Sequence, residues 1–245
     1  AEAGELPIKL GNIEGWPATH VAGINQGAFW PAPDARAWVF GVEGADFASA
    51  GNLAAFESFE SWVDNGWIND DANGLDYNDA WGQFAEGVGV FLPAGNWLTA
   101  NLQGAMGDNV GFIAPPPGDS GKVVSVAALS LPFHISSKSK NADLAAGFID
   151  FVMDPANGQV YYDNGRLPAS AGSVGEPADA LTAESAAAWA RIAEDDGLIF
   201  FQDWASDTMF DTLTGGLQEL IGGRLSAEEF VNEVQDDWAT FHANR

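Results

Sequence analysis

Apolar residues along the chain recur mainly at spacings of three and four, the pattern of amphipathic helices. Short continuous apolar runs lie between these stretches and predict buried strands. Helices that alternate with short strands favour an α/β fold. Strands are expected at 8–10, 88–92, 110–114, 123–129 and 133–136, and helices from 15–17 onward and at 52–66, 77–87, 96–102, 141–152, 155–165, 182–195, 203–222 and 226–242.

Residues typical of helix ends support several of these helices. A proline suits the first turn of a helix, and Asn and Ser side chains accept hydrogen bonds from the unpaired first-turn N–H groups. Ser226 with Glu229 has the spacing of a capping box, in which each residue bonds the backbone of the other. The other candidates are Pro17 in the first turn of its helix, and Asn52, Asn96 and Asn141 as N-caps.

The composition describes a folded, strongly acidic chain. Its 245 residues are 47% hydrophobic and only 18% charged, which allows a sizeable core. Asp and Glu number 35 against 9 Lys and Arg, a net charge of −26. Nucleic-acid binding and peripheral binding to anionic membranes both need clustered basic residues, so neither is expected. Cysteine is absent, which excludes disulfides and thiol chemistry within this sequence.

Signatures of catalysis and of metal binding are weak, so neither an enzyme nor a cofactor is expected. The only histidines, His20, His134 and His242, are far apart and lack metal-ligand spacing. The acidic loop 69–76 is either a calcium loop or, as its missing twelfth-position Glu favours, a solvated loop. Paired carboxylates for glycoside hydrolysis are equally well explained as solvated surface. No phosphate-binding loop or nucleophile elbow is present.

Three of the ten tryptophans lie where an element starts, next to polar residues. Trp16 follows a Gly before a Pro, Trp97 follows Asn96, and Trp204 follows Asp203. An aromatic plate beside hydrogen-bonding groups is the combination that a sugar ring needs, since its C–H face stacks while its hydroxyls bond. Each of these tryptophans either contacts a sugar or only anchors a turn.

Six segments, in order along nearly the whole chain, resemble the extracellular solute-binding proteins of bacterial ABC sugar importers, the maltose-binding-protein-like family 1. Each segment alone is a weak signal, and their common order is a strong one. The segments are 6–16, the helix-to-strand unit 77–91, Gly-Asn-Trp at 95–97, 131–151, 154–168 with its Gly-Arg-Leu-Pro ending, and Gly-Gly-Arg-Leu-Ser-Ala-Glu-Glu at 222–229.

The resemblance implies a two-lobed α/β fold of the periplasmic-binding-protein type II, of which only the later portion is matched. By that analogy 1–122 and 178–245 form the C-terminal lobe, and 123–177 an incomplete part of the N-terminal lobe with the hinge crossings. The chain is therefore expected to be a fragment, completed by another chain, by a missing N-terminal segment or by self-association. Unpaired strand edges and an apolar helix face are expected at 123–177.

The resemblance also implies a function without covalent chemistry. A sugar or oligosaccharide binds in an interlobe cleft, and the closed protein delivers it to an ABC permease outside the cytoplasm, in the periplasm or at the cell surface with a lipid anchor upstream. The alternatives are a binding protein for a non-sugar solute and a glycoside hydrolase. Stacking is expected from Trp16, Trp97 and Trp204, hydroxyl bonding from Asn96 and Asp203, and either a ligand contact or a structural ion pair from Arg166.

Overall fold

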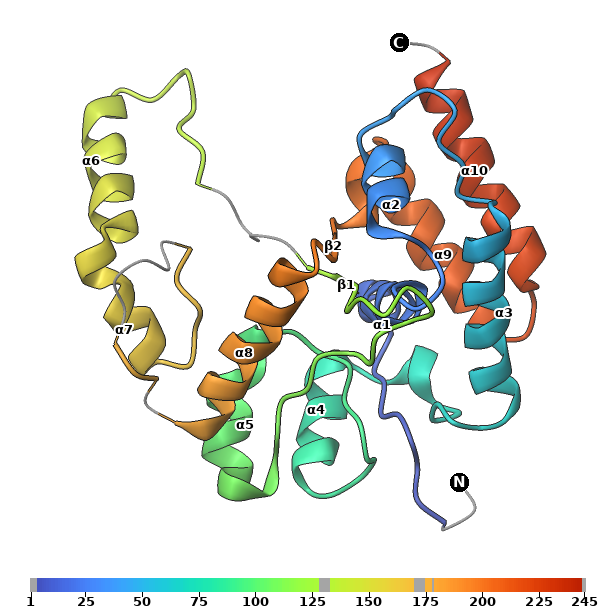
Figure 1. Cartoon of the computed structure of the whole chain (residues 1–245), viewed down its shortest axis with the longest axis horizontal. Coiled ribbons are helices and arrows are strands. Elements are labelled where there is room, and N and C mark those ends of the chain that lie inside the picture. The colour runs from blue at the N-terminus through green and yellow to red at the C-terminus, as the bar shows by residue number, and fades with distance from the viewer. Residues whose placement is uncertain (1–3, 128–132, 170–174, 178, 244–245) are drawn as a thin grey trace. The chain divides into compact units, whose positions relative to one another are not determined.

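The computed structural model describes residues 4–127, 133–169, 175–177 and 179–243 (Figure 1). The chain divides into two compact units, and each is described by itself. Unit 1 comprises Ala1–Ala94, Ala114–Ala128 and Arg191–Arg245, and unit 2 comprises Gly95–Ile113 and Leu129–Ala190. These boundaries differ from those expected for the lobes, 122/123 and 177/178, and the assignment of residues to lobes remains a prediction.

The described residues form a helix-rich α/β structure with little sheet, which confirms the expected fold class. The α-helices are α1 Trp16–Gln26, α2 Ala32–Val39, α3 Ala50–Asp64, α4 Tyr77–Ala85, α5 Thr99–Met106, α6 Ala142–Met153, α7 Gly158–Asp163, α8 Ala180–Glu194, α9 Met209–Ile221 and α10 Ala227–His242. The strands are β1 Ser125–Val126 and β2 Leu198–Ile199, and the 3-10 helices are η1 Ala72–Gly74, η2 Asn96–Leu98, η3 Gly107–Asn109, η4 Pro155–Asn157 and η6 Gln202–Ala205.

The core of unit 1 lies among α1, α3, α9 and α10. α10 packs on α3 and α9, and α1 packs on α3, α9 and β1 (Figure 1). Aromatic rings fill the centre: Phe47 lies 4.7 Å from Trp38, and Phe56 lies 4.6 Å from Phe230, between ring centroids. All four side chains are almost fully buried, so unit 1 has a core of its own.

The extended segments of unit 1 pair in parallel. β1 pairs with β2, and Ile8 forms isolated parallel bridges with Ile68 and with Phe91. The expected strand at 8–10 is thus reduced to one bridging residue, and 88–92 contributes only Phe91. The prediction of strands at 110–114 and 133–136 is wrong, because these apolar runs have no partner to complete a ladder among the described residues. Of the run 123–129, 125–126 is a strand, and 128–129 lies outside the described residues.

The capping predictions were right for two helices and wrong for others. Pro17 lies in the first turn of α1, and the Ser226–Glu229 capping box is present at α10. Ser49, not Asn52, caps α3, because the Asn52 amide is buried in contacts described below. Asn96 is the first residue of η2, and the Asn141 side chain makes no capping bond to α6.

Unit 2 contains a helix that buries nothing. α6 has only two charged residues, yet none of its twelve residues is buried. Leu144, Phe148 and Phe151, spaced four and three apart, are 74%, 57% and 65% exposed, and Phe133 packs against Phe148 with 6.2 Å between ring centroids. An exposed apolar helix face of this kind is unusual on the surface of a folded monomer. The expected apolar face at 123–177 is therefore present. No helix in the described part of the chain has the length and apolar character needed to cross a bilayer.

Replacing the α10 cap tests the account of helix ends. Ser226→Ala removes the acceptor for the Glu229 N–H and breaks the capping box, so the free energy of unfolding in urea should fall by about 1 kcal/mol. Ser226→Asp retains an acceptor and should stay close to the parent. Equal stability of the alanine and aspartate variants would contradict the account.

Candidate functional site

Two loops of unit 1 each follow the carboxyl end of a parallel pairing. The chain continues from the bridging residue Ile8 into 11–16, and from β2 into 200–208. The carboxyl ends of parallel strands are where α/β folds bind ligands, because the loops diverge there and helix N-termini point outward. Trp16 begins α1 and Trp204 lies in η6, so each of the two expected tryptophans of unit 1 follows the carboxyl end of a parallel pairing.

Aromatic side chains from α1, from the start of α4, from the loop 200–208 and from Phe40, the residue after α2, form a continuous series of ring contacts. We call this series the aromatic row. Centroid separations along it are 4.5 Å from Tyr77 to Trp16, 5.3 Å from Trp16 to His20, 5.6 Å from His20 to Phe201, 5.5 Å from Phe201 to Trp204, 6.2 Å from Trp204 to Phe200, and 5.4 Å from Phe200 to Phe40. Trp204 is half-exposed and Phe40 more so, which leaves ring surface open to a ligand.

The start of α1 holds Trp16 in place. The buried Asn12 accepts a bond from the Ala18 N–H through Oδ1 at 2.9 Å, and the Gln218 side chain donates to the Asn12 carbonyl oxygen at 3.0 Å. Gly15 has φ 80°, and a Cβ there would lie 2.7 Å from the Cβ of Thr214. Both the left-handed backbone and the close approach require glycine at the position before Trp16.

His20 joins the two loops within the aromatic row. Its ring contacts Trp16 and Phe201, and burial lowers its pKa to about 4. The imidazole is therefore neutral near neutral pH, and it packs as an aromatic ring rather than as a cation. It lies four residues after Trp16, on the same face of α1.

Three groups of hydrogen bonds fix the segment 202–208. The Gln202 amide donates to Gln26 Oε1 at 2.6 Å, and Gln26 donates to Asn52 Oδ1 at 2.6 Å. His242 Nε2 donates to the Ala205 carbonyl oxygen at 3.1 Å. Asp237 accepts bonds from three hydroxyls, those of Ser206 at 3.1 Å, Thr208 at 2.7 Å and Thr212 at 2.5 Å. These contacts fix the backbone that carries Asp203, Trp204 and Asp207.

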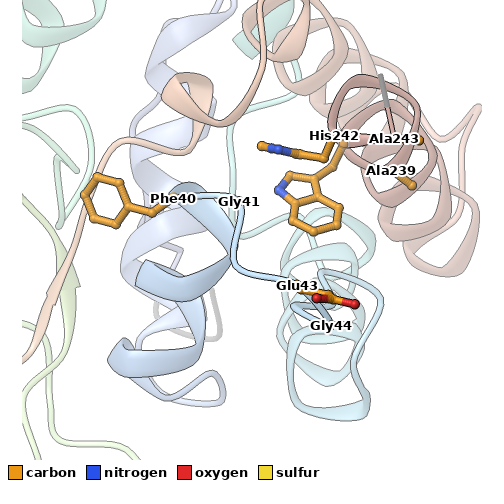
Figure 2. Close-up of a pocket in the computed structure, with 8 residues that line it drawn as sticks. Phe40, Gly41, Glu43, Gly44, Ala239, His242 and Ala243 are labelled. Atoms are coloured by element: carbon orange, nitrogen blue, oxygen red, sulfur yellow. The ribbon is translucent and has the colours of Figure 1, made fainter. Parts of the chain in front are cut away.

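A hollow of about 300 Å³ lies at the Trp204–Phe40 end of the row, and we call it the terminal hollow. Burial raises the pKa of its Asp203 carboxyl. A second hollow of about 440 Å³ adjoins it and shares Phe40 and His242 (Figure 2). A Cβ at Gly41 would lie 2.3 Å from the His242 ring, so glycine is needed at the rim. The terminal hollow is lined by Val39, Phe40, Asp203, Trp204, Ala205, Ser206, Asp207, Phe241 and His242.

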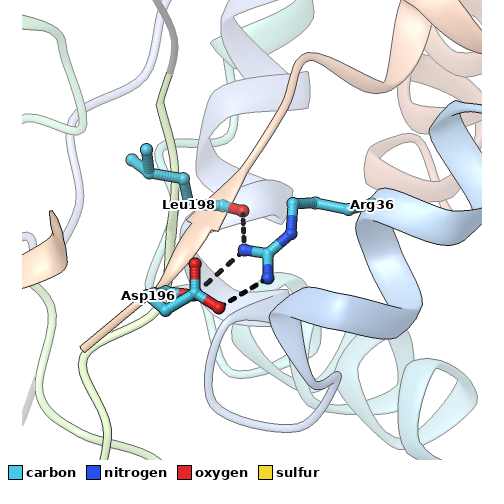
Figure 3. A network of polar contacts seen from close by, with 3 residues as sticks. All are labelled: Arg36, Asp196 and Leu198. Atoms are coloured by element: carbon cyan, nitrogen blue, oxygen red, sulfur yellow. Dashed lines mark hydrogen bonds and ion pairs between the residues drawn. The ribbon is translucent and has the colours of Figure 1, made fainter.

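An arginine sets the position of Phe40 relative to Phe200. Arg36 of α2 forms an ion pair with the Asp196 carboxylate at 2.8 Å, and donates to the backbone oxygens of Asp196 at 3.0 Å and Leu198 at 3.1 Å (Figure 3). Because Leu198 belongs to β2, these bonds attach α2 to the strand that leads into Phe200.

The remaining candidates, Asn96, Trp97 and Arg166, lie in unit 2. The Trp97 ring lies over Gly95, where a Cβ would come within 1.9 Å of ring carbon Cζ3. The Arg166 guanidinium donates to the Trp97 carbonyl oxygen, and the Asn96 carbonyl oxygen accepts a bond from the Thr99 hydroxyl at 2.8 Å. The structure thus brings Trp97 and Arg166 into direct contact.

The candidates fall into two sets, Trp16, Asp203 and Trp204 in unit 1 and the three residues of unit 2. The ligand role of all six remains a prediction. The sequence reasoning missed the rings that connect Trp16 to Trp204: His20 was considered only as a metal ligand, and Phe200 and Phe201 were not considered. The spacing of Trp16 and His20 on one helix face, and of Phe201 and Trp204, was the available signal.

The described residues contain no group of three or more His, Cys, Asp or Glu side chains that could hold a metal ion. In the loop 69–76, Asn69 accepts from the Leu10 N–H at 2.7 Å and donates to the Leu10 carbonyl oxygen at 2.9 Å. Asn73 accepts from Asn12 at 2.9 Å. These two asparagines hold the loop against 10–12.

No family model and no curated protein sequence matches the chain. Solved structures do: a chitin oligosaccharide binding protein has a TM-score of 0.85 at 23% identity, over 99% of this chain and 62% of its own. The raffinose complex of the solute-binding protein RafE has a TM-score of 0.76 at 20% identity, over 98% and 62%. A sugar transporter from Bacillus licheniformis in complex with stachyose has 0.66 at 14%, over 98% and 62%.

These likenesses confirm the resemblance in fold and show that the chain has part of the fold of these two-lobed solute-binding proteins. The chain spans about three fifths of the length of these proteins.

Acidification tests the placement of His20. Its folded-state pKa of about 4 lies below the ordinary 6.5, so only the unfolded chain takes up this proton as the pH falls from 6.5 towards 4, and stability is lost across that window. Between about pH 7 and about pH 5 this one group should lower the free energy of unfolding by about 2 kcal/mol.

His20→Phe retains a ring and removes the titration, so urea titrations should show a correspondingly shallower pH dependence for this variant. The exposed His134 provides the control, and His134→Gln should follow the parent. An unchanged pH dependence in His20→Phe would show that the imidazole is not buried as described.

Proposed function

We propose that this chain is part of a solute-binding protein that captures a sugar or oligosaccharide on the aromatic row of unit 1, without covalent chemistry. The observation that carries the proposal is the row itself: two tryptophans, Trp16 and Trp204, joined by ring contacts through His20 and Phe201, with Asp203 beside them. Aromatic faces stack on the C–H surface of a sugar ring, and carboxylates bond its hydroxyls.

The comparisons support the choice of ligand. The neighbours with this fold include a chitin oligosaccharide binding protein and proteins in complex with raffinose and with stachyose. The fixed loops favour binding too, because a site held in one conformation loses little entropy when a ligand arrives. In the proposed function, the sugar-loaded protein delivers its ligand to an ABC permease outside the cytoplasm.

The row would form one wall of the sugar site, and the other wall would come from the part of the two-lobed fold that this chain does not span. Asn96, Trp97 and Arg166 remain candidates for further contacts. With one wall alone, calorimetry on the 245-residue chain should show sugar binding that is weaker than micromolar, because half of the contacts and the closure are missing.

Removing one ring tests the proposal. Trp204→Ala should weaken the binding of an oligosaccharide such as raffinose or a chitin oligosaccharide by at least roughly tenfold, because stacking residues dominate such sites. Ligand-observed NMR suits the weak affinity expected. Trp67 is also partly exposed but lies outside the row, so Trp67→Ala is the matched control. Equal losses in both variants, or in neither, would refute the proposed site.

The apolar face of α6 supports the expected incompleteness of the chain. Leu144, Phe148 and Phe151 expose more than half of their surface to water, whereas the neighbours are longer than this chain by more than half its length. In the proposed protein, polypeptide that corresponds to the remaining fold covers this face. The alternative is that a second copy of the chain covers the face. The net charge of −26 opposes this, because two copies repel each other.

The isolated chain should therefore bind the apolar dye anilinonaphthalene sulfonate, and Leu144→Gln with Phe151→Gln should lower the dye fluorescence. Val42, an exposed apolar residue of unit 1, gives the control Val42→Gln. Light scattering would detect self-association as a concentration-dependent mass. A monomer with no dye binding at α6, and with 133–169 protected from hydrogen exchange, would contradict the proposal of an open face.

A further inference from the structure

The terminal hollow combines aromatic walls with two carboxylates. Phe40, Trp204 and Phe241 supply rings, and Asp203 and Asp207 supply the charges, around a space of about 300 Å³. An aromatic ring attracts cations to its face through its quadrupole, and a carboxylate does so through its charge. A space of this size accommodates one sugar ring with a substituent.

Neither carboxylate has a basic partner in the described part of the chain. The ion pairs there join Arg36 to Asp196, Arg191 to Glu194 and Asp195, and Arg224 to Glu219. Asp203 is partly buried, and that burial raises the pKa of its carboxyl, whereas Asp207 is exposed. A partly desolvated carboxylate without a counter-charge is unfavourable, and a bound cation would relieve that cost.

The residues around the two carboxylates keep the hollow negative. No Lys or Arg is among the described residues that line either hollow, and the second hollow adds Glu43. The Ser206 hydroxyl has no proton left to donate to a carboxylate of the hollow, because it already donates to Asp237 at 3.1 Å. His242 directs its Nε2–H to the Ala205 carbonyl oxygen, so that proton does not serve Asp203 or Asp207.

The backbone that carries the two carboxylates is also held in place. Asp207 lies between Ser206 and Thr208, and both of these hydroxyls bond Asp237. Asp203 follows Gln202, whose amide is bonded to Gln26. Carboxylates on a fixed segment can select among ligands by the position of a charge.

We infer that the terminal hollow selects a cationic amino sugar, one with a free ammonium group, over the corresponding neutral sugar. The inference rests on the proposed function and names the ligand class of the same site. The ring stacks on Trp204, and the ammonium group lies between the Asp203 and Asp207 carboxylates. A charge-assisted hydrogen bond is stronger than a hydroxyl bond to the same oxygen, by enough to tighten binding roughly tenfold.

Three disaccharides of the same linkage test this selection by calorimetry or ligand-observed NMR on the 245-residue chain. They are the β-1,4-linked glucosamine disaccharide, its N-acetylated form, and cellobiose, which differ only in the group at C2: ammonium, acetamide or hydroxyl. At a pH where the amine is protonated, the glucosamine disaccharide should bind roughly tenfold more tightly than cellobiose.

Variants separate a built site from general attraction to an acidic protein. Asp203→Asn and Asp207→Asn should each weaken the binding of the amine more than the binding of cellobiose, so the ratio of the two affinities should fall towards one. Glu57 is exposed and lies on α3, outside both hollows, so Glu57→Gln makes the same change in net charge and should leave the preference intact.

The outcomes distinguish this inference from the proposed function. If cellobiose binds as well as the amine, or if the preference survives in both Asn variants and disappears with added salt, the inference is overturned while sugar binding stands. If none of these sugars, and neither raffinose nor a chitin oligosaccharide, binds a chain that still unfolds cooperatively, the proposed function fails as well.

Discussion

A buried series of side-chain amides connects the loops on which the candidate site depends. Gln202 bonds Gln26, Gln26 bonds Asn52, and Asn52 donates to the Phe47 carbonyl oxygen at 2.7 Å. These bonds join η6, α1 and α3, all inside unit 1. A buried amide that loses its hydrogen-bond partner lowers the stability of the fold by about 1 to 3 kcal/mol. These bonds therefore fix the positions of the three elements relative to one another. Trp16 and Trp204 lie on two of the three joined elements, which is why their separation is fixed.

The remaining contacts of the site reinforce that constraint rather than add separate ones. The Arg36 bonds attach α2 to β2, the Asp237 hydroxyl cluster holds 206–212 to α10, and His20 fills the space between the two loops. Arg36, Asp237 and His20 are all polar or titratable side chains, and each has contacts with neighbouring residues of the fold. The open surface that remains is aromatic and acidic, at Phe40, Trp204 and Asp203. A surface with that chemistry is suited to ligands that offer both C–H faces and hydrogen-bond donors.

Much of this could be predicted from the sequence, for physical reasons that differ by element. Helix positions follow from local spacing and caps, so α1, α4 and α10 lie close to where they were expected. Strands need partners far away in sequence, and the apolar runs at 110–114 and 133–136 lack them among the described residues. Asn52 illustrates the same limit: its type suits a cap, but the buried bond to Gln26 determines its role. The tryptophans at element starts were recognisable, whereas the rings that connect them depend on contacts between distant segments.

The central claim is that the aromatic row of unit 1 contacts a sugar. The most direct measurement follows the indole N–H resonances of the protein by NMR while an oligosaccharide is added. The account predicts that the resonances of Trp16 and Trp204 shift in a saturable manner, whereas those of the buried Trp38 and Trp238 stay in place. An absence of shifts at Trp16 and Trp204, with saturable shifts confined to other tryptophans, would contradict the account.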